Sequence, residues 1–281
     1  PSNEVVIIGG GITGLASAWL LEEAGYTRIT LLEASDYIGG KIKTERDNGF
    51  LVETGPDALM ITKPGVREFI QKLGIESQLI EPASRQFYIL HDGKLQSVPA
   101  GFASMVPADI GAFIKSSLIS LPGKARMLAE RLVPARKHDK DESLADFITR
   151  RFGREVLDQL AEPLFSGVYS APADDLSIKA TFPHFHRMEA QYGSITKAVL
   201  NTRKKQGPPT SSPFRSFQDG MDTLPSSILY QLKHTKLLRN TAVETLQKTE
   251  SGYIVKTPDH TFHADQVIST IPAYQMAPAI Q

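Results

Sequence analysis

The chain begins with an apolar run, three glycines and a second apolar stretch of helical spacing. Val5–Ile8 is a continuous run of β-branched residues, which is typical of a strand buried on both faces. The apolar positions of Leu15–Leu21 follow a helical period, and this pattern ends at Gly25. Ile29–Leu32 has the composition of a second strand. The pattern predicts a strand–helix–strand unit with a glycine-rich turn between its first two elements.

Farther along, a mainly helical region lies between two regions with strand patterns. Helices are predicted at residues 66–73, 110–120, 124–132, 143–151, 155–164 and 221–232. Strands are predicted at residues 87–90, 95–98, 237–238, 242–249, 252–257 and 266–269, and a loop at 203–213. Asp92-Gly93 separates the first two of these strands and indicates a hairpin. We therefore expect an α/β fold whose Rossmann-like dinucleotide domain is split in sequence by an inserted, mostly helical region.

The composition excludes several classes of protein. Lys and Arg number 31 in 281 residues and Asp and Glu also number 31, so the net charge indicates neither nucleic acid nor an anionic surface as a partner. The absence of cysteine excludes disulfides and thiolate chemistry and fits a reducing compartment. No run approaches a membrane-spanning length, and no basic-then-apolar leader precedes the first strand. We expect a cytoplasmic protein that is not an integral membrane protein.

Gly9, Gly11 and Gly14 form the motif G-x-G-x-x-G between the first strand and the helix. Gly9 allows a tight turn, Gly11 lets the backbone approach a diphosphate, and Gly14 lets the helix pack close to the strand. The helix N-terminus offers N–H groups and a partial positive charge to phosphates. Glu33 ends the second strand, where it can accept hydrogen bonds from a ribose. An ordinary glycine-rich turn would explain Gly9 alone, so dinucleotide binding is the favoured interpretation.

Five residues separate Glu33 from Gly39-Gly40-Lys41. This spacing resembles the FAD proteins of the amine-oxidase type, in which the second glycine turn lies along the extended FAD. Most relatives carry arginine at the basic position, and Lys41 keeps the charge but loses the two-pronged geometry. Phe50–Pro56 resembles the strand and turn that lead under the flavin ring in that family. Because an NAD dehydrogenase needs neither feature, we predict FAD as the cofactor.

A narrower resemblance is carried by Glu162–Ser170, which is similar to a stretch of the protoporphyrinogen/coproporphyrinogen oxidases of haem biosynthesis. Tyr192–Ser194, Phe217–Leu224 and Ser269–Pro272 also match that family, and the resemblance runs from residue 5 to about residue 274. It implies FAD-dependent oxidation of a porphyrinogen to the porphyrin, with O2 as acceptor and H2O2 as product. No catalytic acid or base is assigned, because the flavin carries the chemistry.

The resemblance assigns the cofactor and substrate residues. Those expected to bind FAD are Gly9, Gly11, Ile12, Thr13, Gly14, Glu33, Ala34, Gly39, Gly40, Lys41, Gly55, Pro56, Asp57, Val243 and Thr270. Those expected to meet the substrate are Lys63, Phe165, Gly167 and Tyr169.

Two departures from the family bear on substrate and completeness. Animal and plant members usually place an arginine where this chain has Asp57, so the pattern is closer to the Gram-positive branch, which favours coproporphyrinogen III. Lys63 is then the candidate cation for a propionate. Relatives continue for well over a hundred residues past this sequence, so we expect part of a longer chain and leave open whether it holds FAD alone. The choice between coproporphyrinogen and protoporphyrinogen also stays open.

The expected domains are a first part of the FAD-binding domain (1–62), a substrate-domain segment (63–100), a mostly helical insertion (101–205) and a second FAD-binding part with a β meander (206–281). His184 and His186 are expected to share one face of a strand, as a surface or pocket-edge pair rather than as metal ligands. Apolar faces at 110–132 could pack against helices, which is favoured, or dock peripherally on a membrane or line a substrate channel. The oligomeric state is left open.

Two alternative functions remain. An amine oxidase or a phytoene-desaturase-type enzyme would share the FAD motifs, and the Phe165–Tyr169 stretch argues against both. Rab GDP-dissociation inhibitors resemble the fold but bind proteins and prenyl groups without a flavin. Gly39-Gly40-Lys41 and Glu33 argue against that class.

Overall fold

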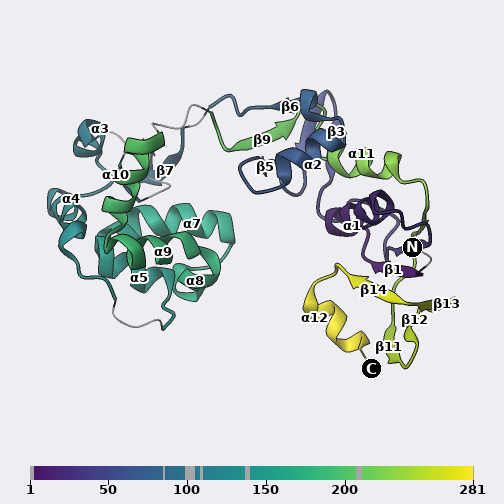
Figure 1. Cartoon of the computed structure of the whole chain (residues 1–281). Helices are drawn as coiled ribbons and strands as arrows, with labels where there is room; N and C mark the ends of the chain where they lie inside the picture. The colour runs from purple at the N-terminus through teal and green to yellow at the C-terminus, as the bar shows by residue number, and fades with distance from the viewer. Residues whose placement is uncertain are drawn as a thin grey trace. The chain divides into compact units, whose positions relative to one another are not determined.

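The computed structural model describes residues 3–84, 86–98, 105–107, 110–136, 140–206 and 211–280, with the backbone alone at 110, 112 and 203–206. The chain divides into two compact units (Figure 1). The first consists of Pro1–Ala83 and Ser211–Gln281, and the second of Ser84–Thr210. A sheet-containing unit built from both ends of the sequence, with a mainly helical unit inserted between them, confirms the predicted α/β class. The exact domain boundaries stay a prediction.

A four-stranded parallel sheet forms the centre of the first unit. Its strands are β1 (Val5–Ile8), β2 (Ile29–Leu32), β10 (Thr235–Leu238) and β14 (Gln266–Ser269), in the order β10-β2-β1-β14. Val5 lies in register with Ile29 on one side and with Gln266 on the other. The strand predicted at residues 266–269 thus belongs to the parallel sheet.

Both faces of this sheet are covered, which explains why the first strand is apolar throughout. Val5 and Ile7 pack in a cluster with side chains of α1 (Ile12–Glu23), α2 (Val66–Lys72) and α11 (Thr223–Gln231). Val6 and Ile8 pack in a second cluster with side chains of β11–β13 and α12. These elements are β11 (Thr245–Thr249), β12 (Gly252–Lys256), β13 (Thr261–Ala264) and α12 (Ala273–Met276). All four β1 side chains are at most 3% exposed.

Short antiparallel pairs complete the first unit. β3 (Thr44–Asp47) pairs with β4 (Phe50–Glu53), and β9 (Phe214–Phe217) pairs with β5 (Leu59–Met60) and with β6 (Leu79–Ile80). Two 3-10 turns also belong here, Glu76–Gln78 and Ala277–Ala279. Sequence patterns missed β3, β5, β6, β9 and β13, because strands of two to four residues carry too little alternation.

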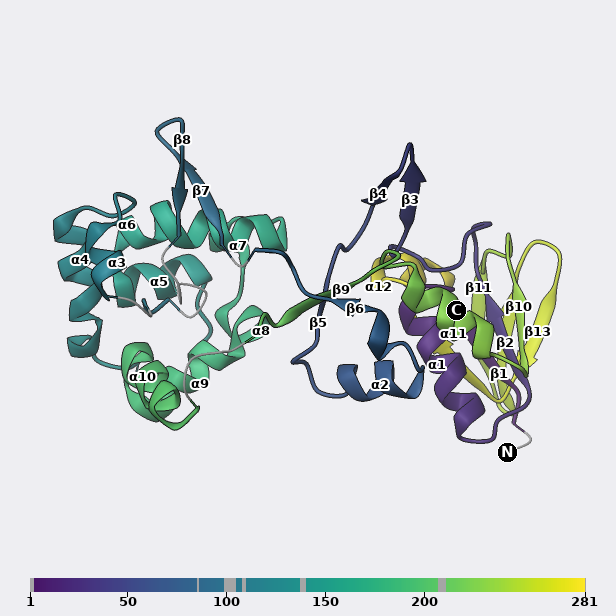
Figure 2. The same cartoon turned by 90° about the horizontal axis from the view of Figure 1, so that it is seen from above.

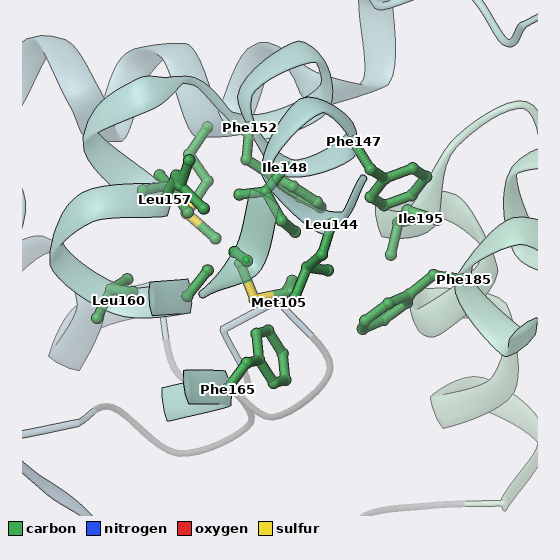
Figure 3. Packing of buried hydrophobic residues seen from close by; sticks show 14 of the residues in the cluster. Met105, Leu144, Phe147, Ile148, Phe152, Leu157, Leu160, Phe165, Phe185 and Ile195 are labelled. Atoms are coloured by element: carbon green, nitrogen blue, oxygen red, sulfur yellow. The ribbon is translucent and has the colours of Figure 1, made fainter. Parts of the chain in front are cut away.

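The second unit combines one hairpin with helices around an apolar core. The hairpin joins β7 (Tyr88–His91) to β8 (Lys94–Ser97), as Asp92-Gly93 predicts. Phe113, Phe147, Phe165 and Phe185 contribute to the core, and Figure 3 shows such side chains gathered around Met105. The helices are α3 (Ile110–Lys115), α4 (Leu121–Leu128), α5 (Leu144–Phe152), α6 (Arg154–Val156), α7 (Glu162–Tyr169), α8 (Ile178–Thr181), α9 (Pro183–Tyr192) and α10 (Ile195–Gln206). Turns of 3-10 type are Ala129–Leu132 and Ala173–Asp175, and Leu157–Ala161 is a π-helical turn.

Several helix boundaries differ from the predicted ones for local reasons. The helix predicted at 110–120 ends at Lys115, and the next one begins earlier, at Leu121, because Ser120 accepts a hydrogen bond from the Gly123 N–H. Ser143 caps α5 in the same way, accepting from the Asp146 N–H at 3.0 Å. α10 continues to Gln206, so the predicted loop at 203–213 begins later, and residues 207–210 lie outside the described residues.

The placement of His184 and His186 on a strand is wrong. Both residues lie on α9, where positions two apart point in different directions, so they do not share a face. His184 is exposed and contacts the rings of Phe182 and Phe185. Apolar residues at helical spacing on α9, including Phe185 and Met188, override the short alternation that suggested a strand. Among the described residues, no group of three or more His, Asp or Glu side chains could hold a metal ion.

A buried ion pair lies among the helices of the second unit. Arg151 on α5 donates to the carboxylate of Glu130, and both side chains are fully buried. Glu130 also accepts from Ser194 Oγ at 2.6 Å and from the Ile195 N–H at 3.0 Å. Burial alone would raise the pKa of Glu130, but the hydrogen bonds from Ser194 and Arg151 outweigh it and hold that pKa below the ordinary value.

No helix in the described part of the chain is long and apolar enough to cross a bilayer.

Candidate functional site

The first glycine turn has the conformation that its motif predicts. Gly9 has a φ of 107°, and a Cβ there would lie 2.6 Å from Thr270 Oγ1. A Cβ on Gly14 would overlap the carbonyl oxygen of Gly9, so α1 can pack this close to the turn only with glycine at that position. Thr270 Oγ1 lies 3.0 Å from the Ile8 carbonyl oxygen and 3.1 Å from that of Gly9. The turn is therefore held from β1, α1 and the end of β14.

The N-terminus of α1 faces this turn without a side-chain cap. Gly11 is the N-cap residue, and no described side chain accepts a hydrogen bond there; the first helical turn also holds no acidic residue. A Cβ on Gly11 would meet one neighbour within 4 Å among the described residues, Gly40 Cα at 3.8 Å. The first N–H groups of a helix lack intrahelical partners and carry partial positive charge. The backbone N–H groups of Ile12 and Thr13, at the start of α1, are therefore suited to bind a diphosphate.

Glu33 is held at the same edge of the sheet by hydrogen bonds to both sides. Its Oε2 accepts from the Gly10 N–H at 2.7 Å, and its Oε1 accepts from the Ser35 N–H and Oγ, each at 2.8 Å. The carboxylate is half-buried, while Ala34 beside it is exposed. Sequence reasoning passed over Gly10, although a Cβ there would lie 3.1 Å from Glu33 Oε2. The unbroken run of three glycines was the available signal.

The second glycine turn lies directly against the first. The Gly39 N–H donates to the Gly10 carbonyl oxygen at 2.9 Å, and a Cβ on Gly40 would lie 2.9 Å from Gly11 Cα. Tyr37 Oη donates to the Ile42 carbonyl oxygen at 2.7 Å and so closes the turn. Burial and the nearby Asp222 carboxylate raise the pKa of Tyr37, so this hydroxyl stays protonated. Segments 30 residues apart in the sequence thereby form one glycine-lined surface.

Two further predicted segments lie at this surface. A Cβ on Gly55 would overlap the Lys41 carbonyl oxygen, so the turn at Gly55-Pro56-Asp57 touches the second glycine turn. The side chains of Lys41, Pro56 and Asp57 are exposed. On the other side, the Thr241 N–H donates to the Glu33 carbonyl oxygen at 2.8 Å, which places the segment leading to half-buried Val243 beside the second strand.

The predicted cofactor residues therefore gather within the first unit, and their geometry suits an extended dinucleotide. Backbone amides at the start of α1 and the space beside Gly11 fit the diphosphate, and the Glu33 carboxylate fits ribose hydroxyls. An exposed ammonium on Lys41 adds positive charge at the second turn. That these particular residues bind the cofactor stays a prediction.

The predicted substrate residues are divided between the two units. Lys63 is exposed in the first unit, between β5 and α2. Phe165, Gly167 and Tyr169 belong to α7 in the second unit. Phe165 is a core residue, 9% exposed, with its ring 4.6 Å from that of Phe182. Tyr169 is exposed at the end of α7 and also contacts the ring of Phe182. A substrate site formed by these residues stays a prediction.

Comparison with known proteins shows similarity along nearly the whole chain. It is 38% identical to coproporphyrinogen III oxidase from Bacillus subtilis (strain 168), an alignment that covers 96% of this chain and 60% of the relative. It is 28% identical to protoporphyrinogen oxidase 2, chloroplastic/mitochondrial, from Arabidopsis thaliana, over 96% of this chain and 57% of that one. The chain thus spans about 60% of the length of the curated relatives it matches.

A solved structure agrees with these relatives. The structure resembles the crystal structure of a provisionally named protoporphyrinogen oxidase from Exiguobacterium sp. 255-15, with a TM-score of 0.85 and 31% identity. The comparison covers 99% of this chain and 61% of that one. A reduced UDP-galactopyranose mutase, 20% identical with a TM-score of 0.68, shares the fold.

The sequence model of the family described as Flavin containing amine oxidoreductase matches residues 12–281. This match confirms the prediction that the protein is a flavoprotein with FAD as its cofactor. The chain belongs to the family of flavin containing amine oxidoreductases.

Proposed function

We propose that the protein takes part in haem biosynthesis as a flavoprotein that oxidises a porphyrinogen, coproporphyrinogen III or protoporphyrinogen IX, to the porphyrin, with O2 as acceptor and H2O2 as product. The observation that carries the proposal is 38% identity to a coproporphyrinogen III oxidase along almost the whole chain. The glycine surface around Gly11 and Gly40 supports it, because it fits the cofactor that such a reaction needs.

The chemistry that FAD supplies when bound is the removal of two electrons per step from the porphyrinogen. The role of the chain's own residues is to bind and orient the cofactor. Amides at Gly11–Thr13 would hold the diphosphate, the Glu33 carboxylate would accept from ribose hydroxyls, and the Lys41 ammonium would offset phosphate charge. Thr270 holds the first turn in shape through the Gly9 carbonyl oxygen. On this proposal a well-positioned backbone, rather than an acid–base side chain, is the protein's main contribution.

The proposed substrate contacts come from exposed polar and aromatic side chains. A porphyrinogen carries propionate groups, and Lys63 is an exposed cation that could pair with one of them. Tyr169, exposed at the end of α7, offers an aromatic surface for the tetrapyrrole edge. Asp57 is an acidic residue and offers no positive charge to a propionate, which favours the bacterial substrate pattern. Phe165 and Gly167 stay substrate candidates through the family resemblance.

A peripheral contact with the inner face of the membrane, in an otherwise cytoplasmic protein, is a further part of the proposal. The apolar residues at 110–132 divide into two groups. Phe113 and Met127 are buried in the core of the second unit, as the favoured interpretation predicts, whereas Leu121, Leu128 and Leu132 are 74%, 51% and 85% exposed. These exposed leucines support the contact. Sedimentation with phospholipid vesicles tests it, and binding that is unchanged in a Leu121→Ser/Leu128→Ser/Leu132→Ser triple variant would contradict this assignment.

The activity is tested by adding coproporphyrinogen III to the purified protein in air and following porphyrin fluorescence. A yellow protein that produces porphyrin and H2O2 supports the proposal. A yellow protein that forms no porphyrin, but oxidises an amine or desaturates a carotenoid, would assign it to a sister class of flavoenzyme. A colourless protein that releases no flavin on denaturation would favour a binding protein of the GDP-dissociation-inhibitor type.

A further inference from the structure

The β3–β4 hairpin contacts the rest of the first unit through its base. Thr44 is buried, Glu53 is half-buried, and the other strand residues are exposed. Among them, Phe50 is 71% and Val52 49% exposed. Figure 2 shows the two strands projecting from the unit. Because an isolated two-stranded hairpin is marginally stable in water, contacts at its base must determine where it lies.

Those contacts are made with the start of α11, across a sequence separation of more than 160 residues. Glu53 Oε1 accepts from the Met221 N–H at 2.8 Å, and Glu53 Oε2 accepts from Thr44 Oγ1 at 2.8 Å. Thr44 Oγ1 in turn accepts from the Asp222 N–H at 3.0 Å. Two backbone N–H groups immediately before α11, those of Met221 and of the N-cap residue Asp222, are therefore satisfied by the hairpin, and the carboxylate also suits the partial positive charge at the helix N-terminus.

Close packing restricts this arrangement further. Gly220 has a φ of 99°, and a Cβ there would overlap Thr44 Cγ2. Arg46 adds two hydrogen bonds to the Asp222 carboxylate, each 3.0 Å long, although its own side chain is 53% exposed and the pair is weak for that reason. We call Thr44 and Glu53, with the Met221 and Asp222 amides that they hold, the hairpin clasp.

Both turns predicted to line the cofactor leave the hairpin at this clasp. Lys41 precedes Thr44 by three residues, and Gly55 follows Glu53 by two. The two turns also touch, since a Cβ on Gly55 would overlap the Lys41 carbonyl oxygen, and the Thr54 N–H donates to the Lys43 carbonyl oxygen at 3.0 Å. A displacement of the hairpin base would therefore move both turns together.

We infer that Thr44 and Glu53 are positioning residues, which hold the turns at Gly39–Lys41 and Gly55–Asp57 in the geometry that FAD requires. The inference rests on the proposed function, because it assumes that these turns meet the cofactor. Neither side chain needs to touch FAD. Their effect is preorganisation: the protein does not have to order the two turns when the cofactor binds.

The test compares Thr44→Val with Thr44→Ser by titrating FAD into the FAD-depleted protein. Valine keeps the shape but leaves Glu53 Oε2 and the Asp222 N–H without a partner, whereas serine keeps the hydroxyl. We expect the FAD Kd to rise about tenfold for Thr44→Val, equivalent to about 1.4 kcal/mol, and to stay within about twofold for Thr44→Ser. Thr261→Val, at an exposed position of β13, is the matched control. Equal affinities for all the variants would overturn the inference.

Hydrogen exchange on the FAD-free protein gives an independent readout. Thr44→Val should accelerate exchange at the amides of residues 39–41 and 55 relative to Thr44→Ser, with exchange in β1 unchanged. Glu53→Gln should act in the same direction, and Glu45→Gln on the exposed face of β3 should not. Exchange that is unaffected in these turns would contradict the clasp. If the unsubstituted protein binds no FAD, the proposed function fails, and the exchange comparison still decides whether the clasp holds the turns.

Discussion

Glu33→Gln perturbs a side chain that accepts three hydrogen bonds at the surface predicted to bind the cofactor. The substitution keeps the shape of the side chain but removes its charge and replaces one acceptor oxygen with an NH2 donor. At present the carboxylate accepts from the Gly10 N–H on one side and from the Ser35 N–H and Oγ on the other. A glutamine can satisfy one of these backbone donors, but not both.

The structure indicates which hydrogen bond the glutamine keeps and how much the free energy of unfolding falls. Gly10 is buried and Ser35 is exposed, so the remaining amide oxygen turns toward Gly10, and water replaces it at Ser35. The retained bond loses its charged acceptor, which costs about 1 kcal/mol, and the partly rehydrated bond costs about 1 kcal/mol more. We expect the free energy of unfolding to fall by about 2 kcal/mol. Sequence reasoning alone predicts little effect on folding, because it assigns Glu33 to the ribose only.

Urea unfolding of the FAD-free protein, followed by circular dichroism, measures this loss, and FAD titration measures the effect on binding. Weaker hydrogen bonds from the ribose hydroxyls should raise the FAD Kd about tenfold to a hundredfold. Glu23→Gln, at the exposed end of α1, is the matched control. An unchanged unfolding midpoint would refute the structural role of Glu33, and an unchanged FAD affinity would refute its assignment to the cofactor.

Three further predictions concern packing and buried charge. Gly14→Ala should prevent stable folding or lower the free energy of unfolding by at least about 1–3 kcal/mol, because the new methyl group overlaps the Gly9 carbonyl oxygen. Expression level and circular dichroism measure this effect. Gly167→Ala is the control, because a Cβ there meets no described atom within 4 Å. Glu130→Gln should cost up to about 3 kcal/mol in urea unfolding, since it leaves buried Arg151 with Glu189, a carboxylate already shared with Arg150, as its remaining counterion. The folded-state pKa of Glu130 lies below its ordinary value of 4.5, so its ionised carboxylate contributes to the free energy of unfolding above pH 4.5. This contribution is lost as the pH falls through the folded-state pKa. Urea unfolding midpoints between pH 7 and 3 should show the loss of stability, and a flat profile would contradict it.

Helix and strand assignments succeeded where the chain carries its own local signal. Ser143 and Asp92-Gly93 are examples, since a cap and a tight turn depend on residues that are neighbours in the sequence. The assignment of His184 and His186 failed because a two-residue spacing carries little information, and the apolar face of α9 decided the conformation. Short strands such as β5 and β9 form because partners far away in the sequence pair with them.

For the surface predicted to bind the cofactor, the sequence by itself determined the residue types: the glycines of both turns and the acid at the end of β2, whose spacing predicts their roles. The tertiary structure alone decided their contacts. It placed Gly40 against Gly11, bound Glu33 to the Gly10 amide, and joined Glu53 to the start of α11. The physical reason is that turn conformation follows from steric limits within a few residues, whereas contacts between segments far apart in the sequence depend on the packing of whole elements.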